Sequence, residues 1–255
     1  MKYMLPLLIT GSLLLSACAP TTPTAQHGGN DSESGGHQQG TTEGSANLIV
    51  RDQSTDTEIA FSVREGNETF ADYGVSHTKE MHLIVVRDDL QNFHHLHPER
   101  DSEGIWRVAF TPPAGGIYWR YADFVDTDEK TYTIQFDKEY SGDLGTYGIA
   151  KNSETVKTVG GYRIALETAK TGNDVSFTYK ITNADGQPVQ VEEYLGARGH
   201  SVLISPTGDF IHAHASEEGE DPVFTTTLPP DTFYRAFTQF QIKGKVMTVN
   251  FDWQS

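Results

Sequence analysis

The chain has 255 residues, of which 36% are hydrophobic and 11% aromatic, so it can bury one large core or two ordinary ones. Its formal charge is −16 at pH 7, from 35 acidic and 19 basic residues. Such an acidic chain is repelled by nucleic acid and by anionic lipid headgroups, which excludes a nucleic-acid partner and membrane binding through a basic patch.

Residues 1–17 are predicted to form a lipoprotein signal peptide. Lys2 supplies a positive charge, and an apolar run from Leu5 to Leu15 follows it. This run is shorter than the roughly 20 residues that a membrane-spanning helix needs. It ends in the stretch Leu15-Ser16-Ala17-Cys18, which resembles the bacterial lipobox, in which the cysteine is diacylated and becomes the new N-terminus. An ordinary cleaved signal with an incidental cysteine is the alternative.

Cys18 is the only cysteine of the chain, so it has no disulfide partner. We expect diacylglycerol and an N-acyl chain such as palmitate on Cys18, which would anchor the protein to a bacterial membrane in the cell envelope, facing outside the cytoplasm. Removal of the signal takes away Lys2 and no acid, which changes the formal charge from −16 to −17. Residues 18–45 are rich in Thr, Pro, Gly, Ser and Gln and predict a flexible tether.

From residue 46 onward the sequence shows short runs in which apolar and polar residues alternate, and no long helical stripe. Five of these runs predict strands, at Thr57–Glu65, Glu80–Val86, Ile105–Phe110, Gly116–Phe124 and Thr131–Phe136. Gly, Asn, Asp and Pro between the runs mark turns. The pattern therefore predicts an all-β protein.

The two halves of the chain share an internal repeat, with matching segments 116 to 118 residues apart. The four pairs of matching segments start at Glu58 and Asp174, Met81 and Gly199, Phe93 and Phe210, and Ile117 and Phe233. Each unit, at residues 46–140 and 155–255, has the length of an antiparallel β-sandwich of about seven strands. We expect two tandem immunoglobulin-like domains that lack the cysteine pair of antibody domains.

Six of the ten histidines occupy matching places in the two repeats. In each repeat one histidine precedes a His-x-His pair, and the two triads are His82, His95 and His97, and His200, His212 and His214. Alternate residues of a strand share a face, so the two histidines of each pair point the same way, whereas His94 points away.

Turn residues separate the early histidine from the pair, as RDDLQN in the first repeat and as SPTGD in the second. If each segment is a hairpin, we expect position 82 to lie opposite position 96, and position 200 opposite position 213. The early histidine would then be within cross-strand reach of the midpoint of the pair. Three imidazoles are therefore expected to converge in each repeat.

Three neutral imidazoles suit Cu(II) or Zn(II) and leave a coordination position for water or for a partner's ligand. His77 is a further candidate ligand in the first repeat, and Asp123 is a candidate to hydrogen-bond a ligand imidazole. Met81 offers a thioether that Cu(I) favours, but as the strand neighbour of His82 it should point to the opposite face. The alternative is that the histidines pack and hydrogen-bond without metal.

The stretches KEMHLIVVRDDLQNFHHLHPE and EYLGARGHSVLISPTGDFIHAHA resemble motifs of a group of bacterial secreted and lipid-anchored proteins associated with copper and heavy-metal handling. The resemblance covers Glu58 to Phe251. It implies that the six triad histidines are the motif residues, with Met81 and the turn Leu195-Gly196-Ala197 as accompanying features. The chain departs from the motifs at Arg198, where Met is common, and at Ala215, where Pro is common. The first departure argues against a Cu(I) site in the second repeat.

The leading hypothesis is a membrane-anchored lipoprotein that binds copper or zinc for buffering, sensing or delivery, with a metal transporter or another extracytoplasmic metalloprotein as its partner. The alternative is a tandem immunoglobulin-like module that binds another protein, with structural or pH-responsive histidines and no metal. We do not expect an enzyme, because no acid or base recurs near both triads and no phosphate loop, nucleophile elbow or HExxH motif occurs. Three histidines with an open position are also the ligands of zinc hydrolases, which keeps a zinc-type hydrolytic site as a third hypothesis.

Overall fold

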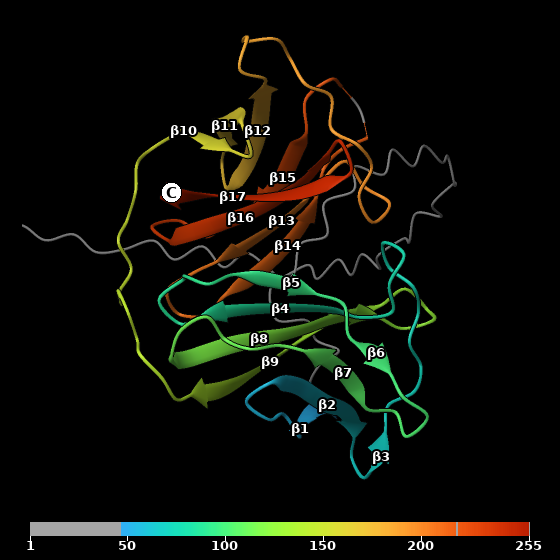
Figure 1. Ribbon diagram of the computed structural model, residues 1–255. Helices are drawn as coiled ribbons and strands as arrows, with labels where there is room; N and C mark the ends of the chain where they lie inside the picture. The colour runs from blue at the N-terminus through green and yellow to red at the C-terminus, as the bar shows by residue number, and fades with distance from the viewer. Residues whose placement is uncertain (1–46, 218, 255) are drawn as a thin grey trace, which may run out of the picture. The chain divides into compact units, whose positions relative to one another are not determined.

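The computed structural model describes residues 47–217 and 219–254. The predicted signal peptide, the predicted lipid attachment at Cys18 and the predicted tether lie outside these residues. The elements of the described chain are β-strands that pair antiparallel (Figure 1). Among these residues there is no helix long and apolar enough to cross a membrane.

The first repeat is a sandwich of two sheets. One sheet has the order β1-β2-β7-β6, with β3 paired to β2, and the other has the order β5-β4-β8-β9. The strands are β1 (Leu48–Asp52), β2 (Glu58–Glu65), β3 (Glu68–Thr69), β4 (His82–Arg87), β5 (His94–Leu96), β6 (Glu99–Arg100), β7 (Trp106–Ala109), β8 (Gly116–Val125) and β9 (Thr131–Tyr140). Phe61, Leu83 and Phe124 belong to the apolar core between the two sheets.

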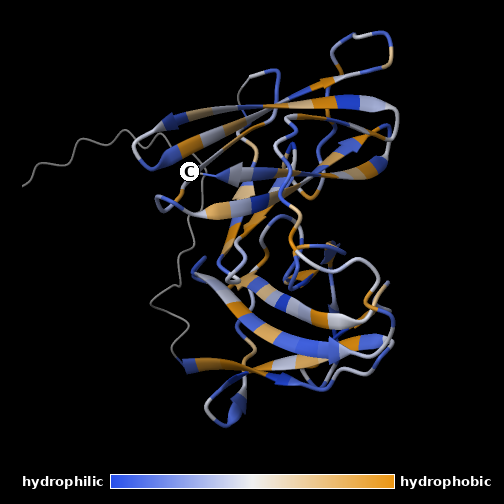
Figure 2. Cartoon of the chain, turned by 90° about the vertical axis from the view of Figure 1, so that its left-hand side faces the viewer, coloured by the Kyte–Doolittle hydropathy of each residue, from blue (hydrophilic) through white to orange (hydrophobic). Residues whose placement is uncertain are grey.

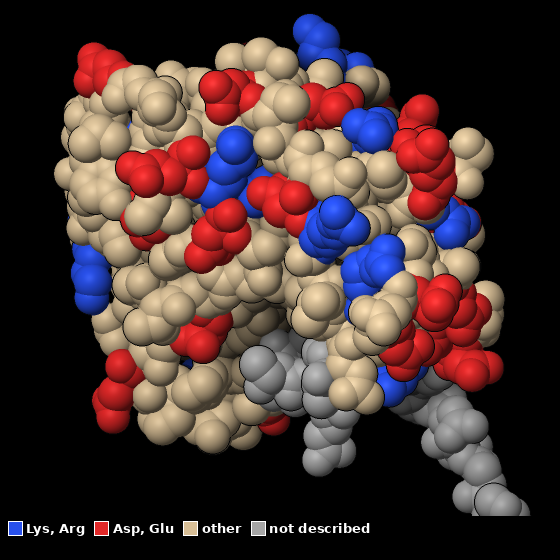
Figure 3. Space-filling view, turned by 90° about the horizontal axis from the view of Figure 1, so that it is seen from below, with Lys and Arg blue, Asp and Glu red and all other residues tan. Residues whose placement is uncertain are grey.

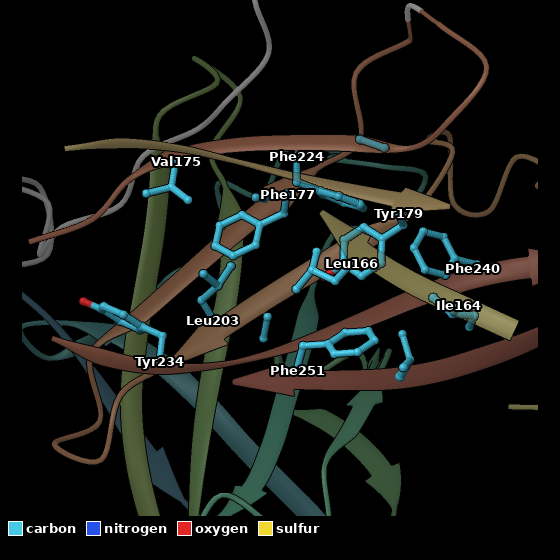
Figure 4. Packing of buried hydrophobic residues seen from close by; sticks show 14 of the residues in the cluster. Ile164, Leu166, Val175, Phe177, Tyr179, Leu203, Phe224, Tyr234, Phe240 and Phe251 are labelled. Atoms are coloured by element: carbon cyan, nitrogen blue, oxygen red, sulfur yellow. The ribbon is translucent and has the colours of Figure 1, made fainter. Parts of the chain in front are cut away.

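The second repeat is built in the same way, from the sheets β10-β11-β12-β15 and β14-β13-β16-β17. Its strands are β10 (Val156–Val159), β11 (Tyr162–Thr171), β12 (Asp174–Thr182), β13 (His200–Ile204), β14 (Phe210–His214), β15 (Val223–Thr227), β16 (Phe233–Ile242) and β17 (Lys245–Gln254). Phe177, Tyr179, Leu203 and Phe251 pack between its sheets (Figure 4).

Alternation of apolar and polar residues explains why most of these segments are strands with one buried face. Buried and less buried residues alternate along β12, and Figure 2 shows hydrophobic and hydrophilic residues alternating along several strands. The architecture confirms the expected fold class, two tandem immunoglobulin-like sandwiches that arise from an internal repeat.

Strands β4 and β13 depart from this alternation, because every residue of both strands is buried. One face of each strand packs into its own sandwich, and the other face contributes to a third apolar cluster shared by the two repeats (Figure 1). This interface cluster consists of Ile84, Val86, Leu90, Tyr121, Val202, Ile204, Phe210, Phe233 and Phe237. A strand covered on both sides is mostly apolar on both sides. The exceptions in β4 and β13 are the buried polar residues His82, Arg87, His200 and Ser201.

Aromatic stacking and a buried hydrogen bond reinforce the interface cluster. The Phe93 and Phe237 ring centroids are 4.4 Å apart, and those of Tyr121 and Phe210 are 4.6 Å apart. The Tyr121 hydroxyl donates to the Gly208 carbonyl oxygen at 2.9 Å. The two repeats therefore meet through the sheets that carry the histidines.

Candidate metal centre

Both His-x-His pairs lie on hairpins, as the spacing predicts, but the register differs by one residue from the expected one. In the first repeat Leu83 pairs with Leu96, and the same register places His82 opposite His97. In the second repeat His200 pairs directly with His214. Residues directly opposite each other share a face of the sheet. The expected register, with position 82 opposite position 96, would have turned His82 away from the pair.

The histidines of each repeat converge, as expected. One possible ligand atom from each of His82, His95 and His97 lies within 4.8 Å of the others, and the same holds for His200, His212 and His214. Strand geometry explains the convergence, because alternate residues and their direct partners point to the same side. That side faces the other repeat. His82 shares a strand face with Ile84, two residues along β4, and His200 shares one with Val202 in β13. Ile84 and Val202 belong to the interface cluster.

A tight turn holds the first histidine of each triad. His82 Nε2 lies 3.0 Å from the Ser76 carbonyl oxygen, and His200 Nε2 lies 2.9 Å from the Tyr194 carbonyl oxygen. A carbonyl oxygen only accepts, so Nε2 carries the ring proton in both histidines. The other nitrogen, Nδ1, is then left with a lone pair, which is the form that binds a metal ion.

Residues of the opposite repeat hold the middle histidine of each triad. His212 Nδ1 donates to Asp123 Oδ2 at 2.7 Å, and His95 Nδ1 donates to Gln239 Oε1 at 2.9 Å. Asp123 lies opposite His82 in the first repeat, and Gln239 lies opposite His200 in the second. The two contacts are thus equivalent under the repeat, and each leaves Nε2 of the imidazole as the lone-pair nitrogen.

The remaining nitrogens face one another without an ordinary hydrogen-bond arrangement. His82 Nδ1 and His95 Nε2 are 3.0 Å apart, although the outer contacts of both rings leave a lone pair on each of these atoms. Within the two triads, four more nitrogens are buried with no hydrogen-bond partner among the described residues: His97 Nε2, His200 Nδ1, His212 Nε2 and His214 Nε2. Two ligands about 2.0 Å from one tetrahedral ion are about 3.3 Å apart, which is close to the His82–His95 separation.

Burial keeps the triad imidazoles neutral. Desolvation lowers the pKa of His97 to about 4 and that of His200 to about 3. Desolvation also lowers the pKa of His82, and it lowers the pKa of His95 and His212 further, with neighbouring imidazoles as a smaller cause for these two. The pKa of His214 is lowered for the same reasons. Neutral imidazole is the form that ligates Cu(II) and Zn(II).

A cavity of about 40 Å³ adjoins the histidines. Its lining includes His82 of the first triad, His212 and His214 of the second triad, and Asp123. A cavity of about 10–15 Å³ already holds one water molecule, so there is room for an ion with a water ligand.

The other candidate residues lie in different surroundings. His77 stacks on His214 with ring centroids 3.6 Å apart, so it accompanies the second triad and not the first, where we had expected it. Met81 is buried in the core of the first repeat. His94 points away from the triad, as expected, and packs edge-on against Phe110.

Sequence reasoning found Asp123 but missed Gln239, Ser76 and Tyr194. Asp123 does hydrogen-bond an imidazole of a triad, although the imidazole belongs to the other repeat. Gln239 could have been found, because it stands in the second repeat where Asp123 stands in the first. Ser76 and Tyr194 act through backbone carbonyl groups, which leave no side-chain signal in the sequence.

Fold and site together define a tandem immunoglobulin-like β-sandwich protein that carries two three-histidine clusters. The chain belongs to the family described as Domain of unknown function (DUF8832), whose model matches it twice, at residues 44–142 and 157–255. A search of curated proteins found no significant match.

Three solved structures with low sequence identity illustrate the similarity of the fold. A two-domain fibronectin type-III segment of chicken tenascin is 11% identical with a TM-score of 0.25, and the match covers 82% of this chain and 97% of that one. A beta-glucuronidase from Parabacteroides merdae is 11% identical with a TM-score of 0.23, over 82% of this chain and 24% of that one. A DUF3823 family protein from Bacteroides ovatus is 9% identical with a TM-score of 0.23, over 72% and 94% of the two chains.

Proposed function

We propose that this protein binds Cu(II) or Zn(II) through its two histidine triads and serves to buffer, sense or deliver the metal. The observation that carries the proposal is the orientation of the imidazoles. In His82, His95, His200 and His212 the outer nitrogen donates to an oxygen atom, so the inner nitrogen presents a lone pair. Such an array of buried lone pairs is unfavourable alone and favourable around a cation.

The composition of the site supports these two metals. All ligand atoms in the triads are imidazole nitrogens, which suit Cu(II) and Zn(II), whereas Cu(I) favours thiolates and thioethers. The Asp123 carboxylate, which contacts a triad histidine, already accepts hydrogen bonds from His212 and Thr133. Its engagement favours a positioning role over acid-base chemistry, and we therefore propose a binding protein and not an enzyme.

The proposal extends to the location of the protein. A lipid on Cys18 and a tether of residues 18–45 would hold the two sandwiches outside the cytoplasmic membrane, where they would exchange metal with a transporter or another metalloprotein. The resemblance of the histidine motifs to those of secreted and lipid-anchored proteins of metal handling supports this setting. The net charge of −16 supports attraction of cations and not of nucleic acid.

The alternative is an immunoglobulin-like interaction module without metal, and the fold is compatible with it. A pH-responsive version of this module would need histidines that titrate between about pH 5 and 8. Burial places the pKa of His97 at about 4 and that of His200 at about 3, below this range. The metal hypothesis therefore explains the buried imidazoles better.

Calorimetric titration of the full chain in detergent with Cu(II), and separately with Zn(II), tests the proposed function. We expect saturable binding with a Kd below about 1 μM. The double variants His95→Ala/His97→Ala and His212→Ala/His214→Ala should each lose binding at one triad.

His94→Ala is the matched control, because His94 lies between the two ligands of the first pair but packs against Phe110. This variant should bind as the unchanged protein does. Absence of saturable binding, or equal binding by all four proteins, would contradict the proposed function.

A further inference from the structure

We infer that the two triads form a single dinuclear centre across the two repeats, in which Asp123 and Gln239 each position a ligand of the opposite repeat's triad. This inference rests on the proposed function and adds the number of ions, their coupling and their order of binding. The contacts between the two triads join residues far apart in the chain, such as Asp123 and His212.

Rings of different triads lie almost as close together as rings of the same triad. The centroid of His82 is 5.2 Å from that of His95 in its own triad and 5.7 Å from that of His212 in the other. His95 is similarly placed, 5.8 Å from His212 and 6.0 Å from His200. Four imidazoles from both repeats are thus neighbours, and ions bound by the two triads would be neighbours too.

The cavity beside the histidines belongs to both triads. His82 lines it from the first repeat, and His212 and His214 line it from the second. Its volume of about 40 Å³ is several times the roughly 10–15 Å³ that one water molecule needs. A water or hydroxide bound to one ion would therefore lie within reach of the other.

Neither triad is complete within its own repeat. Asp123 of the first repeat hydrogen-bonds His212 of the second, and Gln239 of the second repeat hydrogen-bonds His95 of the first. Partners of this kind fix ring orientation, and their loss usually lowers metal affinity by about 10–100-fold. Binding at each triad therefore depends on a side chain that the other repeat supplies.

The two exchanged contacts differ in charge, and this difference predicts the order of binding. A carboxylate makes its imidazole a stronger ligand than an amide does, because it stabilises the positive charge that develops on the ring. The triad of the second repeat, in which Asp123 holds His212, should therefore be the first to bind an ion. The second ion meets the repulsion of the first at short range and should bind more weakly. Titration should therefore show two steps.

The test is a Cu(II) titration of the full chain in detergent, followed by calorimetry and by electron paramagnetic resonance. One equivalent should give the spectrum of isolated Cu(II). A second equivalent should broaden or diminish this spectrum instead of doubling it, because the two spins interact. On a His95→Ala/His97→Ala background, only the isolated spectrum should appear.

The positioning roles are tested with reciprocal substitutions. Asp123→Asn should weaken the first binding step by about 10–100-fold and change the spectrum of the first ion. Gln239→Glu should strengthen binding at the first triad and bring the two steps closer together. Asp231→Asn, which removes the same charge from an exposed residue, should change neither step.

Each result decides between outcomes. Two ions with spectra that simply add, or only one ion per chain, would overturn the dinuclear centre while the proposed function stands. On a His212→Ala/His214→Ala background only the first triad is left to bind Cu(II). If Asp123→Asn weakens Cu(II) binding on that background, the cross-repeat role is overturned. If Asp123→Asn does not fold, Gln239→Glu still tests that role, and unchanged binding by it would count against the inference. No binding by the unchanged protein would contradict the proposed function itself.

Discussion

The two nitrogens of the His82, His95, His200 and His212 imidazoles face chemically different surroundings. In His82 and His200 the outer nitrogen meets a turn carbonyl group, and in His212 it meets the Asp123 carboxylate. The inner nitrogen of His82 lies 3.0 Å from that of His95, and the inner nitrogens of His200 and His212 are buried without a hydrogen-bond partner. The ring is therefore oriented and held in one tautomer before any ligand arrives, which lowers the entropy that binding must overcome.

Neutral buried imidazoles predict that the metal-free protein loses stability in mild acid. The unfolded chain takes up protons near the ordinary histidine pKa of 6.5, whereas the folded chain takes them up at about 4 at His97 and about 3 at His200. Below pH 6.5 protons therefore favour the unfolded state, by up to about 1.4 kcal/mol per pH unit for each such histidine. We expect the free energy of unfolding, measured with urea, to fall between pH 6.5 and 5.

His97→Asn isolates the contribution of one imidazole. Removing the group should reduce the slope of stability against pH by up to about 1.4 kcal/mol per unit in the same range. Most carboxylates titrate below this range, so they contribute little to the slope. A free energy of unfolding that is constant from pH 6.5 to 5 would contradict the neutral, buried state of the triads.

At the scale of elements, each triad depends on a two-residue turn just before its first histidine strand. Ser76 pairs with Lys79 around His77 and Thr78, and Tyr194 pairs with Ala197 in the second repeat. His77 and Thr78 have φ angles of 49° and 67°, as a type I′ turn requires. This geometry points the Ser76 carbonyl oxygen at His82. The second repeat has Gly196, with φ of 74°, where the first has Thr78.

Thr78 is a β-branched residue in a conformation that suits glycine, so we expect Thr78→Gly to stabilise the metal-free protein. Relief of the left-handed strain is worth about 1–2 kcal/mol, and the greater freedom of glycine in the unfolded chain offsets about half of it. The expected gain in the free energy of unfolding is roughly 0.5–1 kcal/mol, measured with urea.

Gly196→Ala is the reciprocal change and should destabilise by a similar amount, because its Cβ would meet no atom closer than 3.8 Å and only the backbone strain would count. A stabilising effect of Gly196→Ala would show that the turn conformation is not the controlling factor.

At the scale of the whole described chain, the apolar interface cluster and the histidine centre are one continuous contact between repeats. Ile84 shares a face of β4 with His82, and Val202 shares a face of β13 with His200. On the face of the molecule shown in Figure 3, acidic and basic side chains are interspersed over most of the surface, and several acidic side chains lie together at the lower right.

Because the proposed metal ligands come from both repeats, saturation with Zn(II) should stabilise the entire described body. A ligand at 100 times its Kd adds about 2.7 kcal/mol per independent site to the free energy of unfolding. We expect thermal unfolding in one transition that moves upward with Zn(II) and returns with a chelator. Two separate thermal transitions, of which only one moves upward with Zn(II), would contradict this expectation.

Phe237→Ala tests how far the interface couples the repeats. Phe237 is 3% exposed and stacks on Phe93, so truncation should cost about 3–5 kcal/mol. We expect it also to weaken metal binding at both triads, because Asp123 and Gln239 reach their histidines across the same interface. Leu166→Ala is the control, since Leu166 belongs to the core of the second repeat and not to the interface. Equal effects of both variants on metal affinity would argue against coupling through the interface.

Much of the fold could be predicted from the chain because it depends on neighbours in sequence. Alternation along Thr131–Phe136 places Tyr132 in the core, with Ile134 and Phe136 packed against it, and the structure has a strand there, β9. The internal repeat predicts two copies of one sandwich. The shared face of His95 and His97, and of His212 and His214, follows from strand geometry alone.

The sequence by itself therefore determined the strands, the repeat and the two groups of three histidines. Only the tertiary structure decided the register of the hairpins, the position of His77 beside His214, and the exchange of Asp123 and Gln239 between the repeats. Turns of the same amino-acid composition can adopt geometries that shift the strand pairing of a hairpin by one residue. Contacts between the repeats depend on which face of β4 and of β13 meets the other domain. Both faces of these strands are buried and largely apolar, so the order of apolar residues along the strand does not show which face that is.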